Sequence, residues 1–173
     1  MSLPRLTLVL GGARSGKSRF AEDMLAGEPA PWVYVATAQA FDSEMESRIG
    51  EHRARRGPDW RTLEAPLDLA GALRQAPGGA PVLVDCLTIW LTNLMLGEHD
   101  AEKAITAFED ALAARAAPVV LVSNEVGLGI VPDNELARRF RDEAGRLNQR
   151  MARQADRVVF MVSGLPMYVK GAP

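Results

Sequence analysis

Residues 11 to 18 have the composition and spacing of a phosphate-binding loop. Gly11, Gly16, Lys17 and Ser18 match the pattern G-x-x-x-x-G-K-[ST]. The glycines let the chain wrap tightly, so successive backbone N–H groups point at one phosphate, and the following helix adds the positive end of its dipole. In such a loop Lys17 bridges the β- and γ-phosphates and Ser18 ligates magnesium. The spacing therefore predicts a nucleotide site.

An acidic residue ends the apolar run PVLVD at residues 81–85. A nucleotide in a phosphate loop needs a carboxylate for its magnesium ion, usually at the end of a nearby buried strand. Asp85 fits this role, although an aspartate here is also common in a turn or as the cap of the next helix. Because Cys86 follows Asp85, no adjacent glutamate is present to polarise a water molecule. This favours transfer to a substrate over hydrolysis.

The segment DSEMESRIGEHRARRG, residues 42–57, places one histidine among arginines. A capping-box pattern at its start and a Gly-Pro stop at its end predict a helix. On that helix Arg48, His52, Arg55 and Arg56 lie near one another by their spacing. Like charges at this spacing destabilise a helix by roughly 0.2–0.5 kcal/mol per pair unless an anion answers them. A bound nucleotide would provide that anion.

Two interpretations of His52 follow from its surroundings. The ordinary pKa of histidine is about 6.5, so a neutral imidazole is available as a nucleophile at physiological pH. Attack of His52 on an α-phosphate would release pyrophosphate and leave a nucleotidyl-histidine, while the arginines stabilise charge on the phosphoryl oxygens. The alternative is a histidine that packs beside Ile49 on a solvated basic helix. Spacing alone leaves both open.

The polar segment SNEVGLGIVPDNE, residues 123–135, follows another apolar run. In open α/β sheets, ligands bind beyond the carboxyl ends of the strands. Asn124 and Glu125 are therefore candidates for contact with the acceptor substrate. Helix capping and turn formation explain the same residues equally well.

Near-continuous apolar runs recur along the chain, as in strands buried on both faces of a parallel sheet. Segments with helical periodicity lie between them, so we expect an α/β fold with helices on both sheet faces. Asp133 is the expected cap of the last helix, and the tail SGLPMYVKG is expected to add a short edge strand. The expected strands are 5–10, 32–36, 81–85, 118–123 and 157–163, and the expected helices are 17–27, 101–115 and 133–155.

Length and composition indicate one ordinary globular domain over residues 1–173. The chain is 47% hydrophobic and 24% charged, and its net charge of −2 argues against a nucleic-acid binder with a basic surface. Cys86 is the sole cysteine, which excludes an intrachain disulfide. No apolar run approaches the roughly 18 residues that span a bilayer. We expect a cytoplasmic protein.

Several segments together resemble one known family, nearly from end to end. They include GGARSGKSRFAE, LVDCLTIWLTNLM and VSGLPMYVKG. More specific are the pattern R-I-x-x-H-x-x-x-R around His52 and the pattern S-N-E-V-G-x-G-I-V-P that begins at Ser123. The chain resembles the bifunctional adenosylcobinamide kinase / adenosylcobinamide-phosphate guanylyltransferase family of cobalamin biosynthesis.

This resemblance implies two reactions. The first phosphorylates the aminopropanol hydroxyl of adenosylcobinamide with ATP or GTP. The second transfers GMP from GTP to that phosphate through a guanylylated His52, which yields adenosylcobinamide-GDP and pyrophosphate. The resemblance also implies a RecA-like P-loop NTPase fold, with a mostly parallel sheet and an antiparallel edge strand, in a homotrimer. The corrinoid is then the small-molecule substrate, and no nucleic acid or membrane span is expected.

The resemblance also assigns the residues of the site. His52 and Lys17 are the expected catalytic residues, and Ser18 and Asp85 are the expected ligands of Mg²⁺. The expected nucleotide contacts are Gly11, Gly12, Ala13, Arg14, Ser15, Gly16, Lys17, Ser18, Ala36, Thr37, Ala38, Arg53, Ala54, Arg55, Arg56, Glu64 and Asp85.

Two rival functions share the phosphate loop. One is a small-molecule kinase in which His52 is only structural. The other is a non-catalytic nucleotide switch that binds a partner protein. The basic segment around His52 and the absence of a glutamate beside Asp85 count against the switch.

Overall fold

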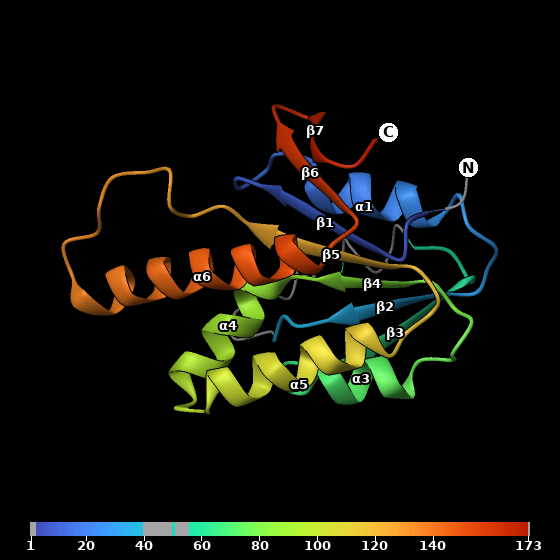
Figure 1. Cartoon of the computed structure of the whole chain (residues 1–173), viewed down its shortest axis with the longest axis horizontal. Helices are drawn as coiled ribbons and strands as arrows, with labels where there is room; N and C mark the ends of the chain where they lie inside the picture. The colour runs from blue at the N-terminus through green and yellow to red at the C-terminus, as the bar shows by residue number, and fades with distance from the viewer. Residues whose placement is uncertain (1–2, 40–49, 51–55, 173) are drawn as a thin grey trace.

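A seven-stranded β-sheet forms the centre of the molecule (Figure 1). The computed structural model describes residues 3–39, 50 and 56–172. Within these residues the strand order is β3-β2-β4-β5-β1-β6-β7, and every neighbouring pair is parallel except β6 with β7. The strands are β1 (Leu6–Gly11), β2 (Trp32–Ala36), β3 (Trp60–Glu64), β4 (Val82–Asp85), β5 (Val119–Asn124), β6 (Arg157–Val162) and β7 (Leu165–Lys170).

The apolar runs form strands because both faces of the sheet are covered. Leu8, Val35 and Leu83 are all fully buried in the middle of their strands. Each of the five expected strands forms within one residue of its expected limits, and the tail forms the antiparallel edge strand β7. β3 was not expected, because its sequence WRTLE is largely polar and it lies at the other edge of the sheet.

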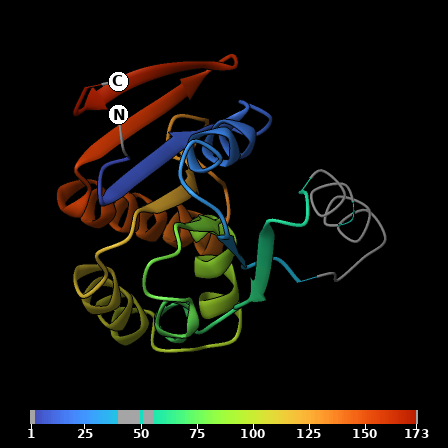
Figure 2. The same ribbon diagram turned by 90° about the vertical axis from the view of Figure 1, so that its right-hand side faces the viewer.

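Helices lie on both faces of the sheet, as expected (Figure 2). On one face Ala21 and Leu25 pack with Val9 and Val122, and the remaining described helices cover the opposite face. None of the described helices is long and apolar enough to cross a membrane. The described helices are α1 (Lys17–Leu25), α3 (Leu69–Gln75), α4 (Leu87–Leu96), α5 (Ala101–Ala113) and α6 (Glu135–Gln154).

The helices differ from the expectation in three places. α3 and α4 were not predicted, and α4 has the largely apolar sequence LTIWLTNLML, which lacks a clear amphipathic period because nine of its ten residues are at least partly buried. The expected cap Asp133 was wrong: Asn134 caps α6, and its side chain accepts a hydrogen bond from the Ala137 backbone N–H at 2.8 Å. The expected helix over residues 42–57 falls largely on residues outside those described.

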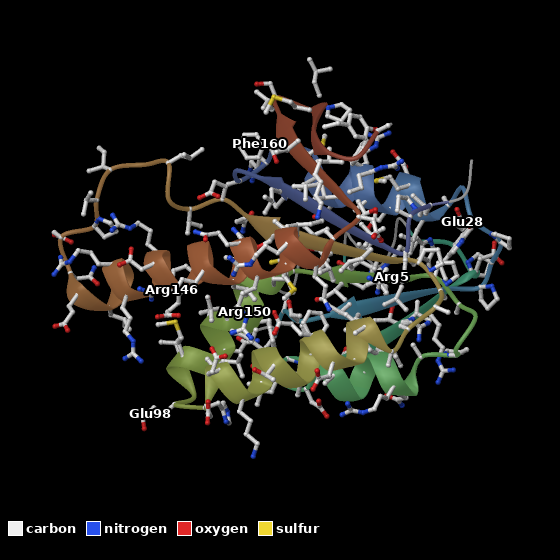
Figure 3. The ribbon with its side chains drawn as sticks, in the orientation of Figure 1. Arg5, Glu28, Glu98, Arg146, Arg150 and Phe160 are labelled. Carbon is white, nitrogen blue, oxygen red and sulfur yellow. The ribbon has the colours of Figure 1, made fainter. Side chains whose placement is uncertain are left out.

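Ion pairs fasten α6 to α5. Arg150 lies on α6 on the side of α5 (Figure 3). Its guanidinium donates hydrogen bonds to the carboxylates of Glu102 and Glu109, both on α5. Glu109 and Arg150 are both largely covered, so this pair is screened less than an exposed one. α6 is thereby held along the sheet face that α5 also covers.

A buried arginine joins the segments that lead into β4 and β5. The Arg115 side chain donates to the backbone oxygens of Leu73, Ala76, Pro77 and Ala80. Only 8% of Arg115 is exposed. These carbonyls lie at the end of α3 and in the turn before β4, where no helical or strand partner is available. The Arg115 side chain supplies their hydrogen-bond donors.

We predict that Arg115→Met lowers the free energy of unfolding by about 2–4 kcal/mol, because methionine keeps the apolar stem and leaves the buried carbonyls without donors. Urea unfolding measures the change. Arg146→Met is the matched control: Arg146 is exposed and pairs with Glu143 on its own helix, so its loss should cost no more than about 0.5 kcal/mol. Equal effects of the two substitutions would contradict the structural role of Arg115.

Candidate functional site

The carboxyl ends of the parallel strands meet along one edge of the sheet. In the strand register, Gly11 pairs with Asn124, and Ala36 pairs with both Asp85 and Glu64. Residues that the sequence singled out separately therefore lie side by side at this edge. In an open α/β sheet this is the edge where ligands bind.

The loop between β1 and α1 is shaped to receive an anion. Gly16 is the N-cap of α1 with a φ of 89°, a left-handed conformation that strains any residue with a side chain. The first turn of α1 carries no acidic residue, and no side chain among the described residues caps it. Its N–H groups and its dipole can therefore attract a phosphate. Lys17 Nζ donates to the Gly12 carbonyl at 3.0 Å, which folds the lysine back over the loop.

The turn between β6 and β7 holds this loop from the side. The Gly164 N–H donates to the Ser15 carbonyl at 3.1 Å. A Cβ atom on Gly11 would lie 2.5 Å from Ser15 Oγ and 3.1 Å from the Met161 carbonyl oxygen. Gly11 therefore allows the loop to close against β6, and Gly16 allows the helix to start in the required direction.

Asp85 occupies the end of β4, as the sequence indicated. The Tyr34 hydroxyl, on the neighbouring strand β2, donates to Asp85 Oδ2 at 3.1 Å. The Thr37 backbone N–H donates to the Asp85 carbonyl, and the Asp85–Cys86 peptide bond is cis. Cys86, not Asp85, is the N-cap of α4, which removes the capping explanation for Asp85.

Thr37 ties the end of β2 to the turn after β4. Its buried Oγ1 donates to the Cys86 carbonyl and accepts from the Cys86 N–H, both at 2.8 Å. Asn93 on α4 donates to the carbonyls of Thr37 and Pro66 at 2.9 and 3.0 Å. The segment 36–38, expected to touch nucleotide, is thus fastened to the element that carries Asp85.

A buried polar network supports the end of β5. Ser123 Oγ donates to Asn148 Oδ1 at 2.7 Å, and Asn148 Nδ2 donates to the Asn124 carbonyl at 3.1 Å. The Asn124 N–H donates to Thr88 Oγ1 at 2.7 Å. The Glu125 N–H donates to the Gly11 carbonyl at 3.1 Å, so the strand end also contacts the phosphate loop.

Three covered polar atoms at this edge lack a hydrogen-bond partner among the described residues. They are Ser15 Oγ in the loop, Asn124 Oδ1 at the end of β5, and Arg56 Nη1. The Arg56 guanidinium carbon lies 3.5 Å from the centroid of the Tyr34 ring. Covered polar atoms elsewhere in the described chain, such as Thr7 Oγ1 and Arg115 Nε, also lack a partner, and at this edge a polar ligand or a water molecule can supply one.

The structure brings together most of the predicted site residues but does not describe all of them. The loop 11–18, the segment 36–38, Arg56, Glu64 and Asp85 belong to this edge or adjoin it. His52, Arg53, Ala54 and Arg55 lie outside the described residues, and their roles stay predictions. Sequence reasoning missed Tyr34, Thr88 and Asn148. The only signal for these was a polar residue within an apolar run or on a helix stripe.

The residues present fit a magnesium ion that is shared with a nucleotide. Among the described residues, no group of three or more histidine, cysteine or acidic side chains could form a complete metal site. Mg²⁺ usually takes only one or two protein oxygens together with phosphates and water. The Asp85 carboxylate, with one oxygen engaged by Tyr34, and the half-buried Ser18 hydroxyl are suitable for that role.

The strand order and the glycine loop after β1 define a RecA-like P-loop fold. Solved structures with this fold resemble the chain at low sequence identity. A Pyrococcus horikoshii OT3 protein covers 97% of this chain and 87% of its own, with a TM-score of 0.57 and 8% identity. The RadB recombinase covers 95% and 86% with a TM-score of 0.54 and 15% identity. A type III secretion ATPase covers 91% and 51% with a TM-score of 0.53 and 13% identity.

Sequence comparison gives the family itself. The family described as cobinamide kinase / cobinamide phosphate guanyltransferase matches residues 7–169, and the chain belongs to it. The bifunctional adenosylcobalamin biosynthesis protein CobP of Pseudomonas aeruginosa is 54% identical, over 96% of this chain and 98% of CobP. The corresponding protein CobU of Salmonella typhimurium is 45% identical, over 95% and 99%. The chain is thus an enzyme of adenosylcobalamin biosynthesis that uses nucleotides.

We predict that Gly16→Ala lowers the affinity for ATP or GTP by about tenfold or more, because the left-handed backbone costs roughly 1–2 kcal/mol for a residue with a side chain. Calorimetric titration with nucleotide measures the affinity. Gly78→Ala is the control, since Gly78 lies in the turn before β4, away from the phosphate loop, and a Cβ there meets nothing within 4 Å. If the two variants bind nucleotide equally well, the backbone of Gly16 does not shape the site.

Cys86 lies beside the site but is chemically quiet. Its side chain is 6% exposed, and burial, assisted by the charge of Asp85, raises the pKa of the Cys86 thiol to about 12. A backbone hydrogen bond at Ile89 and the charge of Lys17 offset part of this rise in pKa. Because the thiolate is the nucleophilic form, the folded protein offers no reactive cysteine at neutral pH.

The raised pKa predicts a loss of stability in alkali. In the unfolded chain the thiol ionises near its ordinary pKa of about 8.5, so its contribution is complete below that pH and is lost as the pH rises toward 12. Between pH 7 and 10 the expected loss from Cys86 is about 2 kcal/mol. Urea unfolding of wild type and Cys86→Ser over this range isolates it, since serine does not titrate. Parallel pH dependences would contradict the prediction.

Proposed function

We propose that the chain carries out both transfers of adenosylcobinamide activation. It first phosphorylates the aminopropanol hydroxyl of adenosylcobinamide with ATP or GTP, and then transfers GMP from GTP to the new phosphate. The observation that carries this proposal is the near full-length identity to a bifunctional adenosylcobalamin biosynthesis protein, combined with an intact phosphate loop.

In the first transfer the acceptor hydroxyl attacks the γ-phosphorus in line. A new oxygen–phosphorus bond forms while the bond to the β–γ bridging oxygen breaks, and the nucleoside diphosphate leaves. The loop N–H groups and Lys17 stabilise charge on the phosphates. The hydroxyl proton passes to Asp85 or Glu125, the two carboxylates at the ends of β4 and β5. Magnesium, held by Ser18 and Asp85, would neutralise phosphate charge.

In the second transfer a neutral His52 attacks the α-phosphorus of GTP. A nitrogen–phosphorus bond forms, pyrophosphate leaves, and Lys17 stabilises its charge. An oxygen of the corrinoid phosphate then attacks the same phosphorus, the bond to the imidazole breaks, and adenosylcobinamide-GDP is released. His52 lies outside the described residues, so its role rests on the sequence pattern around it.

The remaining roles belong to the same proposal. Nucleotide contacts come from the loop 11–18, the segment 36–38, residues 53–56, Glu64 and Asp85. Residues 1–173 act as one domain, and the chain works as a homotrimer in the cytoplasm, where ATP and GTP are supplied. These assignments rest on the resemblance of the sequence to the family.

Labelling with GTP that carries a labelled α-phosphate tests the covalent step. We expect the wild-type protein to retain an acid-labile label, because an N–P bond to imidazole breaks once the ring is protonated. His52→Ala should lose the label completely while it still phosphorylates adenosylcobinamide. His99→Ala is the control, since this second histidine is exposed and lies between α4 and α5, and it should label like wild type.

Two results would change the proposal. Phosphorylation of adenosylcobinamide by a wild-type protein that never carries label would leave a kinase alone, with His52 structural. Label that persists in His52→Ala would assign the covalent step to another residue.

A further inference from the structure

Tyr34 is the polar residue in the otherwise apolar strand β2, and both parts of its side chain have a partner at the site edge. The residue is 5% exposed. Its hydroxyl donates to Asp85 Oδ2 at 3.1 Å, while its ring lies under the Arg56 guanidinium at 3.5 Å. One side chain thus touches a carboxylate at the end of β4 and an arginine four residues after His52 in the sequence.

The hydroxyl fixes the orientation of the Asp85 carboxylate. A hydrogen bond to one carboxylate oxygen stops the group from rotating and leaves the other oxygen for a cation.

The ring fixes the plane of the Arg56 guanidinium. A guanidinium stacked on an aromatic face keeps its N–H groups at the rim of the stack, where they can meet phosphate oxygens. Arg56 Nη1 is covered and finds no acceptor among the described residues. A covered, charged donor in this state is prepared for an anionic ligand.

Packing alone accounts for the ring but not for the hydroxyl. Tyr34 also meets Trp60 edge to face, with ring centroids 6.3 Å apart, so an aromatic residue belongs to this small cluster. A phenylalanine would fill the same space without burying a polar group. The hydroxyl instead meets the carboxylate at the end of β4.

We propose that Tyr34 is a positioning residue, which holds Asp85 toward the magnesium ion and Arg56 toward the phosphates of the same nucleotide. The inference rests on the proposed function for the identity of the ligand. It adds that the basic segment and the carboxylate are aligned through one side chain, so that a change at Tyr34 affects both.

Two substitutions separate the two contacts. Tyr34→Phe removes the donor to Asp85 and keeps the ring, so the Mg²⁺ concentration for half-maximal binding of a fluorescent GTP analogue should rise about tenfold. Its affinity for the analogue without Mg²⁺ should stay at the wild-type value. Tyr34→Leu removes the ring as well, and the affinity without Mg²⁺ should also fall by roughly 3- to 30-fold.

A double-mutant cycle tests the link to Arg56. If Tyr34 acts through this arginine, Tyr34→Leu should cost little additional affinity without Mg²⁺ in an Arg56→Met background. Tyr168→Phe is the matched control, because Tyr168 on β7 also lies beneath an arginine, Arg157, at 5.8 Å but belongs to the edge strand. This control should leave both nucleotide affinity and Mg²⁺ dependence unchanged.

Specific outcomes overturn the proposal. A Tyr34→Phe protein with the Mg²⁺ dependence of Tyr168→Phe would show that the hydroxyl does not orient Asp85. Additive losses in the cycle would show that the ring does not act through Arg56. If Tyr34→Leu fails to fold, Tyr34→Phe, alone and combined with Arg56→Met, still decides whether the hydroxyl orients Asp85. All of these experiments measure equilibrium binding and do not depend on the covalent step. A wild-type protein that binds GTP normally but never becomes labelled would therefore refute the guanylyl transfer and leave the Tyr34 result intact.

Discussion

A parallel sheet that helices cover on both faces cannot hold unpaired polar side chains along its strands, so polar groups gather where the strands end. β4 and β5 follow this pattern with closely packed apolar middles, while β2 carries Tyr34 at its centre, whose hydroxyl is paired with Asp85 at the end of β4, and β1 carries the buried Thr7 near its start. Their register then places Asp85, Asn124 and the phosphate loop on one edge without any further device. The location of the chemistry follows from how the backbone pairs.

Both ends of the sheet carry covered polar atoms. Ahead of β4 and β5, the Arg115 side chain gives several carbonyls a donor, while its own Nε, like Thr7 Oγ1 at the start of β1, has no partner among the described residues. At the opposite edge, covered atoms of Ser15, Asn124 and Arg56 have no partner among the described residues. An atom left unpaired in this way costs roughly 1–3 kcal/mol, and at this edge a ligand atom or a water molecule can supply the missing partner.

Sequence patterns predicted the buried strands, the phosphate loop and the edge position of Asp85, because each of these depends on local composition or spacing. They could not predict α4, whose apolar sequence has no period that separates a buried helix from a strand. They also missed β3, a largely polar edge strand whose pairing with β2 is a long-range contact. Tyr34 was missed for the same reason, since its meaning depends on Asp85 and Arg56, distant in sequence.

Two transfers at different phosphorus atoms of a triphosphate need a common holder and two attacking groups. The loop around Gly16, anchored through Ser15 to the β6–β7 turn, is suited to hold the phosphates in the same way for both reactions. In the proposed mechanism the attacking groups come from elsewhere, namely the acceptor hydroxyl for the γ-phosphorus and His52 for the α-phosphorus. β2 lies between these two parts of the site. Its Tyr34 contacts Asp85 at the carboxyl edge and Arg56, which follows the segment that contains His52. Under the proposed function, the loop can hold the triphosphate for both reactions, and the second reaction then needs only a second attacking group.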